Sequence, residues 1–253
     1  MFRPRVIPVL LLKGKGLVKS VQFKKYRYIG DPINAVRIFN DLKADELVFL
    51  DIIAGKENRT ISLNFIKKVG EEANMPFAVG GGITEIDHIR RILSAGAEKV
   101  IINTNAVLKP DFIRKAADTF GSSTILVCMD VKEDVWGKQK VYISNGRKKT
   151  AWDPEAYAKL MQEMGVGELI VQSILNDGKM SGYDIQLLGK ISKAVTIPVV
   201  ALGGAGKNED FKIAVEEGYV SAVGAGSMFV YHGQRKGILV NYPSREELNR
   251  IFI

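Results

Sequence analysis

Cysteine is almost absent from this chain, and histidine is scarce. The 253 residues contain one cysteine, Cys128, and two histidines, His88 and His232. A single cysteine excludes an intrachain disulfide, which suits a reducing compartment such as the cytoplasm. Two histidines in separate segments and one cysteine cannot supply the usual ligands of a zinc site. The sequence therefore predicts no metal site and no disulfide framework, and we expect no cofactor.

Long apolar runs are also missing. No stretch approaches the roughly 18 to 20 apolar residues that a bilayer-spanning helix needs. The N-terminal apolar run, residues 6–12, is interrupted by Pro8 and is followed by no small-residue cleavage site. We therefore expect neither a membrane span nor a signal peptide, and predict a cytoplasmic protein.

Acidic residues are missing from one basic segment near the N-terminus. The chain has a net charge of +8, and between residues 13 and 27 it has six basic residues and no acidic one. The six are Lys13, Lys15, Lys19, Lys24, Lys25 and Arg27. None of the usual nucleic-acid-binding modules is present, so no nucleic-acid partner is expected. Two interpretations stay open for the segment: a solvated flexible loop, or a loop that attracts phosphates.

Short apolar runs alternate with amphipathic runs along the whole chain. They predict eight strands, at residues 5–11, 46–52, 76–80, 99–103, 124–130, 168–174, 198–203 and 220–226. Helical patterns follow these strands, at 32–43, 61–73, 85–95, 110–119, 153–164, 184–194, 208–217 and 244–252. Strands that are apolar on both faces, with helices in the crossovers, indicate a parallel sheet covered by helices. Eight such units favour an α/β fold, a single (β/α)₈ TIM barrel domain over residues 1–253. The rival open sheet would carry a G-x-G-x-x-G motif after the first strand, and that motif is missing.

The two halves of the chain repeat each other. "DELVFLDI" (45–52) matches "GELIVQSI" (167–174), and "AVGGGI" (78–83) matches "ALGGAG" (201–206), which strengthens the eightfold prediction. Extending the half-barrel repeat to the first strand of each half sets Leu11 opposite Asp130. The second half therefore ends its first strand with a carboxylate, whereas the first half does not.

Two aspartates stand at the ends of predicted strands, where a barrel of this kind has its active site. Asp130 follows five apolar residues, so desolvation is expected to raise the pKa of its carboxyl, and it is the strongest acid–base candidate. Asp51 could hold Lys19 or orient a substrate. For either aspartate the structural alternative is a cap on a turn or on the next helix.

Glycine-rich turns follow predicted strands in both halves. The candidate residues are Gly82 with Asn103 and Thr104 in one half, and Gly204 with Gly226 and Ser227 in the other. Backbone N–H groups at a glycine turn before a helix can approach an anion closely, so these turns suit phosphates. Two such sites at one barrel mouth would suit a substrate phosphorylated at both ends, although the glycines could instead serve tight helix packing. Neither turn fits the loop of nucleoside triphosphatases.

Four charged residues stand at the beginnings of predicted strands, on the opposite face of the barrel. They are Arg5, Glu46, Lys99 and Glu168, two cations and two anions. Such a set can form a neutral, salt-bridged plug at the barrel floor, a face that usually serves stability.

These segments resemble the cyclase subunit of imidazole glycerol phosphate synthase over nearly the whole chain. "RVIP", "DELVFLDI", "VGGGI", "KVIINTNAV", "SGYD" and "GGAGK" stand where that family has very similar segments. The resemblance implies a glutaminase partner that docks on the barrel floor. It also implies that ammonia passes through the barrel to a bisphosphorylated ribulosyl substrate at the mouth, where the imidazole ring closes.

The resemblance also implies roles for individual residues. Gly82, Asn103, Thr104, Asp177, Gly178, Gly204, Gly226 and Ser227 match phosphate-binding positions of the family. Lys19 matches the lysine of a mobile loop, and Asp130 matches one of two catalytic aspartates. Arg5, Glu46, Lys99 and Glu168 match the gate at the ammonia entrance.

The departures from the family pattern concern the mouth. Leu11 stands at the family's first catalytic aspartate, Leu202 at a serine, and Leu175-Asn176 at an Asp-Arg pair. "LLLKGKGLVK" resembles a divergent branch, found beside a glutaminase homologue and a third protein that amidates nucleotide-linked sugars for bacterial surface polysaccharides. Three hypotheses stay open: an ammonia-conducting subunit of such a complex, an active cyclase-lyase of histidine biosynthesis, and a phosphate-binding scaffold.

Overall fold

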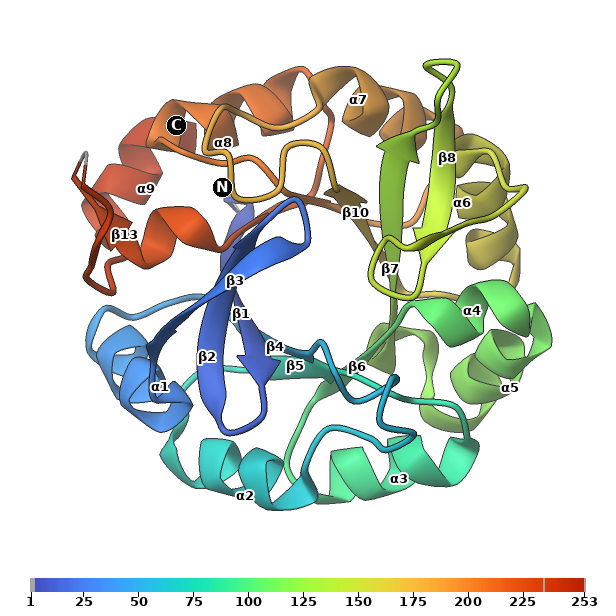
Figure 1. Ribbon diagram of the computed structural model, residues 1–253, viewed down its shortest axis with the longest axis horizontal. Helices are drawn as coiled ribbons and strands as arrows, with labels where there is room; N and C mark the ends of the chain where they lie inside the picture. The colour runs from blue at the N-terminus through green and yellow to red at the C-terminus, as the bar shows by residue number, and fades with distance from the viewer. Residues whose placement is uncertain (1–2, 234, 253) are drawn as a thin grey trace.

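Eight parallel strands close into a barrel in the computed structural model, which describes residues 3–233 and 235–252 (Figure 1). In barrel order they are β1 (Arg5–Lys13), β4 (Leu47–Asp51), β5 (Phe77–Gly80), β6 (Lys99–Ile102), β7 (Ile125–Glu133), β10 (Glu168–Ser173), β11 (Val199–Leu202) and β12 (Ala222–Ala225). The pairing of β12 with β1 closes the ring. The predicted α/β TIM barrel is therefore confirmed, with one strand for each apolar run.

Helices form an outer ring around the strands (Figure 1). They are α1 (Pro32–Asp41), α2 (Leu63–Glu72), α3 (Ile86–Ser94), α5 (Pro110–Phe120), α6 (Pro154–Glu163), α7 (Ile185–Ala194), α8 (Asn208–Glu216) and α9 (Arg245–Phe252), with a short α4 (Thr104–Leu108) between β6 and α5. Asp31 and Asp153 cap the N-termini of α1 and α6. Each aspartate precedes the proline that begins its helix, and its carboxylate accepts the two backbone N–H groups that follow that proline. No helix among the described residues has the length and apolar composition to cross a bilayer.

Alternation along the strands gives the barrel an inner and an outer apolar layer. On β1, Val6 and Leu10 pack outward in the core under the helices, whereas Ile7 and Val9 belong to a separate cluster inside the barrel. The interior cluster consists of Ile7, Val9, Val48, Ala78, Ile101, Leu126, Cys128, Ile170, Val200, Leu202 and Ala222, with Leu50 packed against it. None of these side chains carries a charge at neutral pH, so the interior between floor and mouth is apolar.

Three hairpins stand at the mouth, and the sequence analysis predicted none of them. The basic segment forms β2 (Gly16–Val21) and β3 (Lys24–Gly30), antiparallel strands that continue β1 across the barrel mouth (Figure 1). The second hairpin adds β8 (Gln139–Ile143) and β9 (Lys148–Lys149) to the end of β7, and the third is β13 (Tyr231–His232) with β14 (Gly237–Ile238). The expectation that the basic segment is a loop is therefore wrong, since it is paired strand. Its basic side chains are exposed to solvent except Lys19, which is buried.

Candidate active site at the barrel mouth

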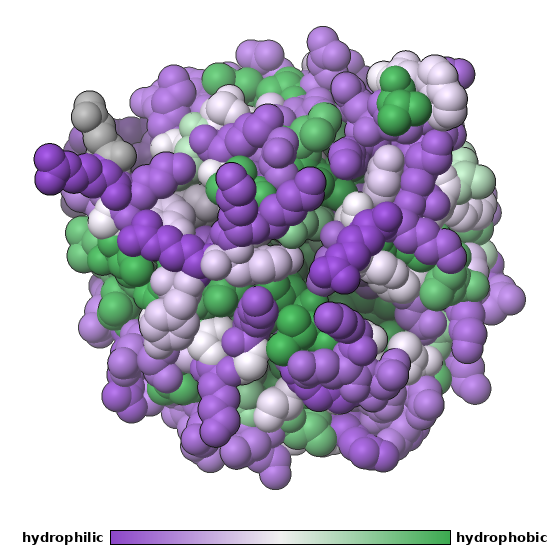
Figure 2. Space-filling model, viewed as in Figure 1, coloured by the Kyte–Doolittle hydropathy of each residue, from purple (hydrophilic) through white to green (hydrophobic). Residues whose placement is uncertain are grey.

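A cavity of about 650 Å³ opens at the carboxyl ends of the barrel strands. The space-filling view of this face shows a hollow near its centre, with hydrophobic residues inside and hydrophilic residues around it (Figure 2). The predicted catalytic and phosphate-binding residues all line this cavity: Lys19, Asp51, Gly82, Asn103, Thr104, Asp130, Asp177, Gly178, Gly204, Gly226 and Ser227. Leu175 and Asn176, also singled out from the sequence, are not among its lining residues. The fold thus brings residues from every part of the chain to one site.

Asp130 is a buried carboxyl group that titrates near neutral pH. It lies on β7 with 6% of its surface exposed, and this burial raises its pKa to about 7. Hydrogen bonding with Cys128 and Asn103 opposes the shift; the Cys128 thiol lies 3.7 Å from the carboxylate. A carboxyl group with a pKa near the working pH can both accept and donate a proton, as acid–base chemistry at the mouth would require.

The variant Asp130→Asn is expected to gain stability over the wild type as the pH rises. In the folded wild type the pKa of Asp130 is about 7, above the ordinary value of 3.8. The protonated carboxyl group therefore stabilises the wild type at low pH, and this contribution is lost as the pH rises through 7. A shift of this size corresponds to at most about 4 kcal/mol. Lys19, whose lowered pKa acts in the opposite direction, is present in both proteins and cancels. Melting temperatures from about pH 5 to about pH 8.5 measure the effect; parallel profiles would contradict it.

Asp51 holds the turn after β4. One carboxylate oxygen accepts the backbone N–H groups of Ile53 and Ala54, both at 3.1 Å, and the other accepts the Arg59 guanidinium at 2.6 Å. The suggestion that Asp51 holds Lys19 is therefore wrong, because its ion-pair partner is Arg59. Orientation of a bound molecule is the predicted role that stays open, since Asp51 still lines the cavity.

Lys19 lies inside the mouth, against Gly226. Its ammonium group donates to the Val9 carbonyl at 2.6 Å, and a Cβ on Gly226 would lie 2.3 Å from the same nitrogen. Burial lowers the Lys19 pKa to about 8, whereas the Asp177 carboxylate acts to raise it. Glycine at position 226 therefore leaves room for a cation beside the turn to which the sequence analysis assigned phosphate binding.

Asp177 and Gly178 contact the β2–β3 hairpin. The Asp177 carboxylate accepts the Ser20 hydroxyl at 3.2 Å and the Phe23 N–H at 3.4 Å, and burial raises its pKa. A Cβ on Gly178 would lie 2.1 Å from the Ser20 carbonyl oxygen. Both residues thus hold the hairpin against the loop after β10 in addition to lining the cavity.

The glycine turns of both halves admit no side chain. Gly82 has a φ of 67°, and a Cβ there would lie 1.8 Å from the Arg59 carbonyl oxygen. Gly204 has a φ of 120°, and its Cβ would lie 2.0 Å from the Gly182 carbonyl oxygen. The chain becomes helical directly after β6 and β12, at Thr104 and Ser227. The geometry is that of tight glycine turns next to helix starts, which leaves both phosphate binding and close packing possible.

Replacing Gly82 by alanine is expected to destabilise the fold by several kcal/mol. The new Cβ would overlap the Arg59 carbonyl and force the turn open. Gly14 is a matched control, because its φ of 65° is nearly the same and nothing lies within 4 Å of its Cβ position. Gly14→Ala should cost only about 1 kcal/mol, the price of a positive φ. Urea unfolding of both variants measures the difference, and equal losses would show that the overlap is relieved without strain.

Several cavity residues escaped the sequence analysis, among them Tyr26, Asn145, Arg147 and Gln172. Asn145 donates to the Ile52 carbonyl at 2.6 Å and so ties the β8–β9 turn to the loop after β4. Gln172 lies beside Asp130 in the β7–β10 register, and a polar residue near the end of the run "ELIVQSI" could have indicated it. The other three lie on mouth hairpins, whose position depends on strand pairing that the sequence does not reveal.

Leu11 faces the same cavity. It follows Ile7 and Val9 on the inward side of β1 and, unlike its buried neighbours Leu10 and Leu12, is partly exposed. Leu50 and Leu202 also line the cavity, so Leu11 belongs to an apolar part of its wall. The position that the half-barrel repeat aligned with Asp130 thus faces the site and carries no carboxyl group.

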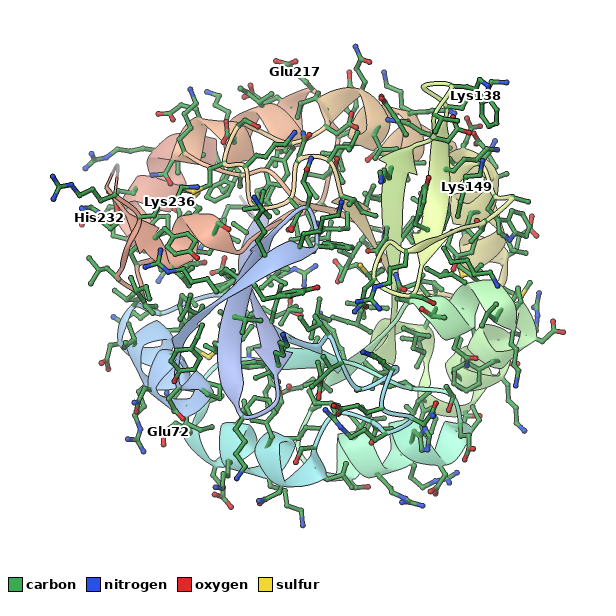
Figure 3. The ribbon with its side chains drawn as sticks, in the orientation of Figure 1. Glu72, Lys138, Lys149, Glu217, His232 and Lys236 are labelled. Carbon is green, nitrogen blue, oxygen red and sulfur yellow. The ribbon has the colours of Figure 1, made fainter. Side chains whose placement is uncertain are left out.

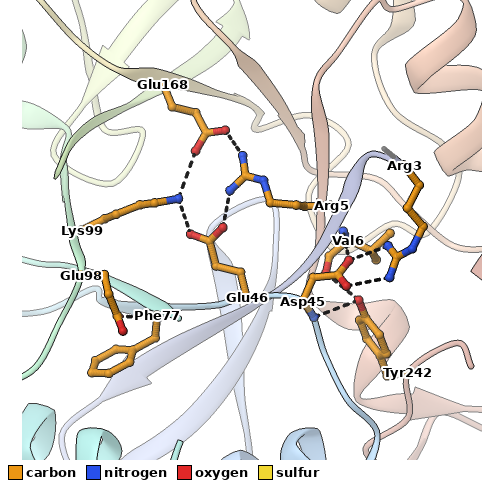
Figure 4. Close-up of polar contacts among 10 residues, drawn as sticks. All are labelled: Arg3, Arg5, Val6, Asp45, Glu46, Phe77, Glu98, Lys99, Glu168 and Tyr242. Carbon is orange, nitrogen blue, oxygen red and sulfur yellow. Dashed lines mark hydrogen bonds and ion pairs between the residues drawn. The ribbon is translucent and has the colours of Figure 1, made fainter. Parts of the chain in front are cut away.

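At the barrel floor, Arg5, Glu46, Lys99 and Glu168 form a closed ring of ion pairs, hereafter the floor ring (Figure 4). Arg5 contacts both glutamates, and the Lys99 ammonium lies 3.0 Å from Glu46 and 3.8 Å from Glu168. The glutamate side chains are 3% and 7% exposed, and burial raises the pKa of Glu168. The predicted salt-bridged plug is confirmed, and the apolar interior separates it from the mouth cavity.

Comparisons with known proteins agree with this architecture. The family model described as "Histidine biosynthesis protein" matches residues 5–236. A Pseudomonas aeruginosa protein provisionally named imidazole glycerol phosphate synthase subunit hisF2 is 44% identical over 249 residues, 98% of this chain and 99% of its own. The imidazole glycerol phosphate synthase subunit HisF of Geobacillus thermodenitrificans is 41% identical over 250 residues, 98% of this chain and 99% of its own. The chain therefore belongs to the histidine biosynthesis protein family, among the HisF-like cyclase subunits of imidazole glycerol phosphate synthase.

Proposed function

We propose that this protein is the ammonia-conducting, phosphate-binding barrel of a glutamine-dependent amidation complex and does not itself close an imidazole ring. One observation carries the proposal: Leu11 faces the mouth cavity at the position of a family catalytic aspartate, while the floor ring is complete. Relative to the family pattern, the mouth has lost a carboxyl group, whereas the floor ring expected at an ammonia entrance keeps all four charged residues.

The mouth offers one acid–base group where the family's reaction uses two. Asp130 can exchange a proton near neutral pH, but Leu11 can neither transfer a proton nor make a charged hydrogen bond. Leu202, at the position of a family serine, adds another apolar side chain to the cavity wall. Loss of a positioned acid or base typically costs a factor of about 10² to 10⁴ in rate, so ring closure would be slow.

The interior suits the passage of neutral ammonia. An apolar interior disfavours the ammonium ion, because an unpaired charge is costly to transfer from water, whereas a small neutral molecule crosses at much lower cost. A glutaminase docked on the floor ring would release ammonia at the floor end of this interior. A phosphorylated ligand would occupy the mouth end. The hisF2 name of one relative supports a branch beside the histidine-pathway subunit. The acceptor would be a nucleotide-linked sugar of a bacterial surface polysaccharide, held by a third protein of the complex.

The test is ammonia-dependent turnover by the purified barrel. With an ammonium salt and the bisphosphorylated ribulosyl precursor, we expect negligible imidazole formation; robust turnover would overturn the proposal. In the assembled complex, Lys99→Ala should reduce glutamine-driven amidation, because it removes one cation of the floor ring. The scaffold hypothesis instead predicts that this variant leaves amidation untouched.

An active cyclase-lyase of histidine biosynthesis is the second candidate. The observation that favours it is the near-neutral pKa of Asp130 at the mouth, together with 41% identity to the Geobacillus thermodenitrificans subunit. It requires another group to replace the missing aspartate. Substitution at Leu11, argued in the Discussion, distinguishes the two.

A further inference from the structure

The tip of the β7–β8 hairpin carries the two most exposed large apolar side chains of the described residues. Val135 is 88% exposed and Trp136 is 75% exposed. In Figure 1 the tip of this hairpin lies at the upper right edge of the molecule, beyond the ring of helices. Tryptophan is usually well buried, so the exposure of Trp136 next to Val135 makes the tip a candidate interaction site.

The tip is an ordered turn. One Asp134 carboxylate oxygen accepts the N–H groups of Trp136 at 3.0 Å and of Lys138 at 3.1 Å. The Asp134 N–H donates to the Lys138 carbonyl at 2.8 Å, and the Gly137 N–H donates to the Asp134 carbonyl at 3.0 Å. Because the turn is already held, a partner would not have to order it on binding, which lowers the entropic cost of association.

Lys149 holds the Trp136 ring from the neighbouring strand. Its ammonium group lies 5.2 Å from the ring centroid and 3.5 Å from the Asp134 carboxylate. The cation–π contact and the ion pair together restrict the ring. Preorganised tryptophans of this kind are among the commonest energetic centres of protein–protein interfaces.

The charge around the tip selects the chemistry of a partner. Residues 131–149 contain six basic and two acidic residues, a net +4 within a chain of net +8. The basic residues are Lys132, Lys138, Lys140, Arg147, Lys148 and Lys149. Figure 3 shows Lys138 and Lys149 along this hairpin, and Figure 2 shows a hydrophobic patch at its tip within hydrophilic surface. A second copy would bring like charges together, whereas an acidic surface would be attracted.

Most of the exposed large apolar side chains lie at the mouth. Seven of the ten follow the carboxyl ends of barrel strands, and one, Tyr219, precedes the start of β12 at the floor. The seven are Val21, Tyr28, Leu108, Val135, Trp136, Ile238 and Leu239. The mouth therefore offers a protein partner more apolar anchors than the floor does.

We propose that the β7–β8 tip docks the ammonia-consuming enzyme of the complex, through an apolar pocket on that enzyme rimmed by carboxylates. Trp136 and Val135 enter the pocket, and the lysines of the hairpin face the rim. The inference rests on the proposed function, because that function delivers ammonia at the mouth. The docked enzyme covers the mouth cavity, so that ammonia leaving the barrel reaches the acceptor without escaping into water.

The first experiment identifies what lies on the tip. A photo-crosslinking residue replaces Trp136 in the full-length chain, in cells that make the complex, and mass spectrometry identifies the product. The proposal expects one protein that, once purified, amidates its acceptor with ammonium chloride alone. Crosslinks to the glutaminase, to a second copy or to lipid, or no crosslink, would overturn it.

The second experiment measures the contact with that purified enzyme as the probe. The double substitution Val135→Ser and Trp136→Ser should weaken its binding to the barrel at least about tenfold and lower glutamine-driven amidation in the reconstituted complex accordingly. Ile213→Ser, an exposed apolar residue on α8, is the matched control and should change neither quantity. Binding should also weaken with added salt, because screening reduces the contribution of the hairpin lysines.

The outcomes separate the two proposals. If Lys99→Ala lowers glutamine-driven amidation while the tip variant binds and delivers ammonia as the wild type does, only the docking proposal is wrong. If neither variant changes amidation, the ammonia-conducting function itself is wrong. Circular dichroism spectra that match the wild type at the assay temperature exclude misfolding as the cause of any loss.

Discussion

The variant Glu46→Gln is expected to lose about 3 to 5 kcal/mol of unfolding free energy. The Glu46 side chain is 3% exposed and pairs with both Arg5 and Lys99. Without its charge, two cations face Glu168 alone in a partly dehydrated ring, and an uncompensated buried charge is costly. Urea unfolding at constant pH measures the loss.

Two further variants show whether burial and charge balance cause this effect. Glu155→Gln removes an exposed helix ion pair with Lys159 at 2.7 Å and should cost less than about 1 kcal/mol. The double variant Glu46→Gln with Lys99→Met leaves Arg5 and Glu168 as a neutral pair, so it should recover much of the lost stability. If Glu46→Gln lowers the unfolding free energy no more than Glu155→Gln does, the floor ring contributes no more to stability than a surface ion pair.

The double variant also separates stability from ammonia delivery. If the double variant is stable, folding does not need all four charges of the floor ring. This outcome is expected because replacing both partners of a buried ion pair together is often energetically neutral. A folded barrel with half of its ring should nevertheless deliver ammonia poorly under the proposed function. Restored stability with unrestored glutamine-driven amidation would identify the ring as functional rather than structural.

The barrel could be predicted because its strands and helices are local patterns. Each apolar run is separated from the next by an amphipathic helix, and parallel strands with helical crossovers leave few topologies. The same argument predicted the floor ring, since barrel closure brings the starts of β1, β4, β6 and β10 to one face. The mouth hairpins could not be predicted in this way. β2 and β8 pair antiparallel with the last residues of β1 and β7, and polar strands such as β3 carry no apolar alternation to indicate them.

Part of the cavity lining was predicted from the sequence, but the contacts between its residues were not. Asp51 and Lys19 both line the cavity, yet one pairs with Arg59 and the other with the Val9 carbonyl. The position of Lys19 depends on a missing side chain at Gly226, more than 200 residues away in the chain. Spacing along the sequence carries no information about such a contact. The orientation of Leu11 was accessible, because the alternation of a strand and the half-barrel repeat both place it facing inward.

The substitution Leu11→Asp is expected to raise ammonia-dependent imidazole formation at least about 100-fold above the wild-type background. The new carboxyl group would face the cavity that Asp130 lines, at the inward position beyond Val9. Two acid–base groups would then be present at the mouth, and a positioned acid or base typically contributes a factor of about 10² to 10⁴. Steady-state turnover of the bisphosphorylated ribulosyl precursor with an ammonium salt measures the gain.

The control is Leu11→Asn, which has nearly the size of aspartate but cannot exchange a proton. It should leave turnover at the wild-type background, so that a gain seen only with aspartate reports proton transfer rather than a wider or more polar cavity. Both variants lose the apolar side chain beside Leu50, its partner in the β1–β4 register, and equal melting temperatures would show that folding does not separate them. High turnover by the wild type, unchanged in Leu11→Asp, would mean that another group replaces the missing aspartate. The protein would then be a working cyclase, and the apolar wall around Leu11 would belong to its catalytic site.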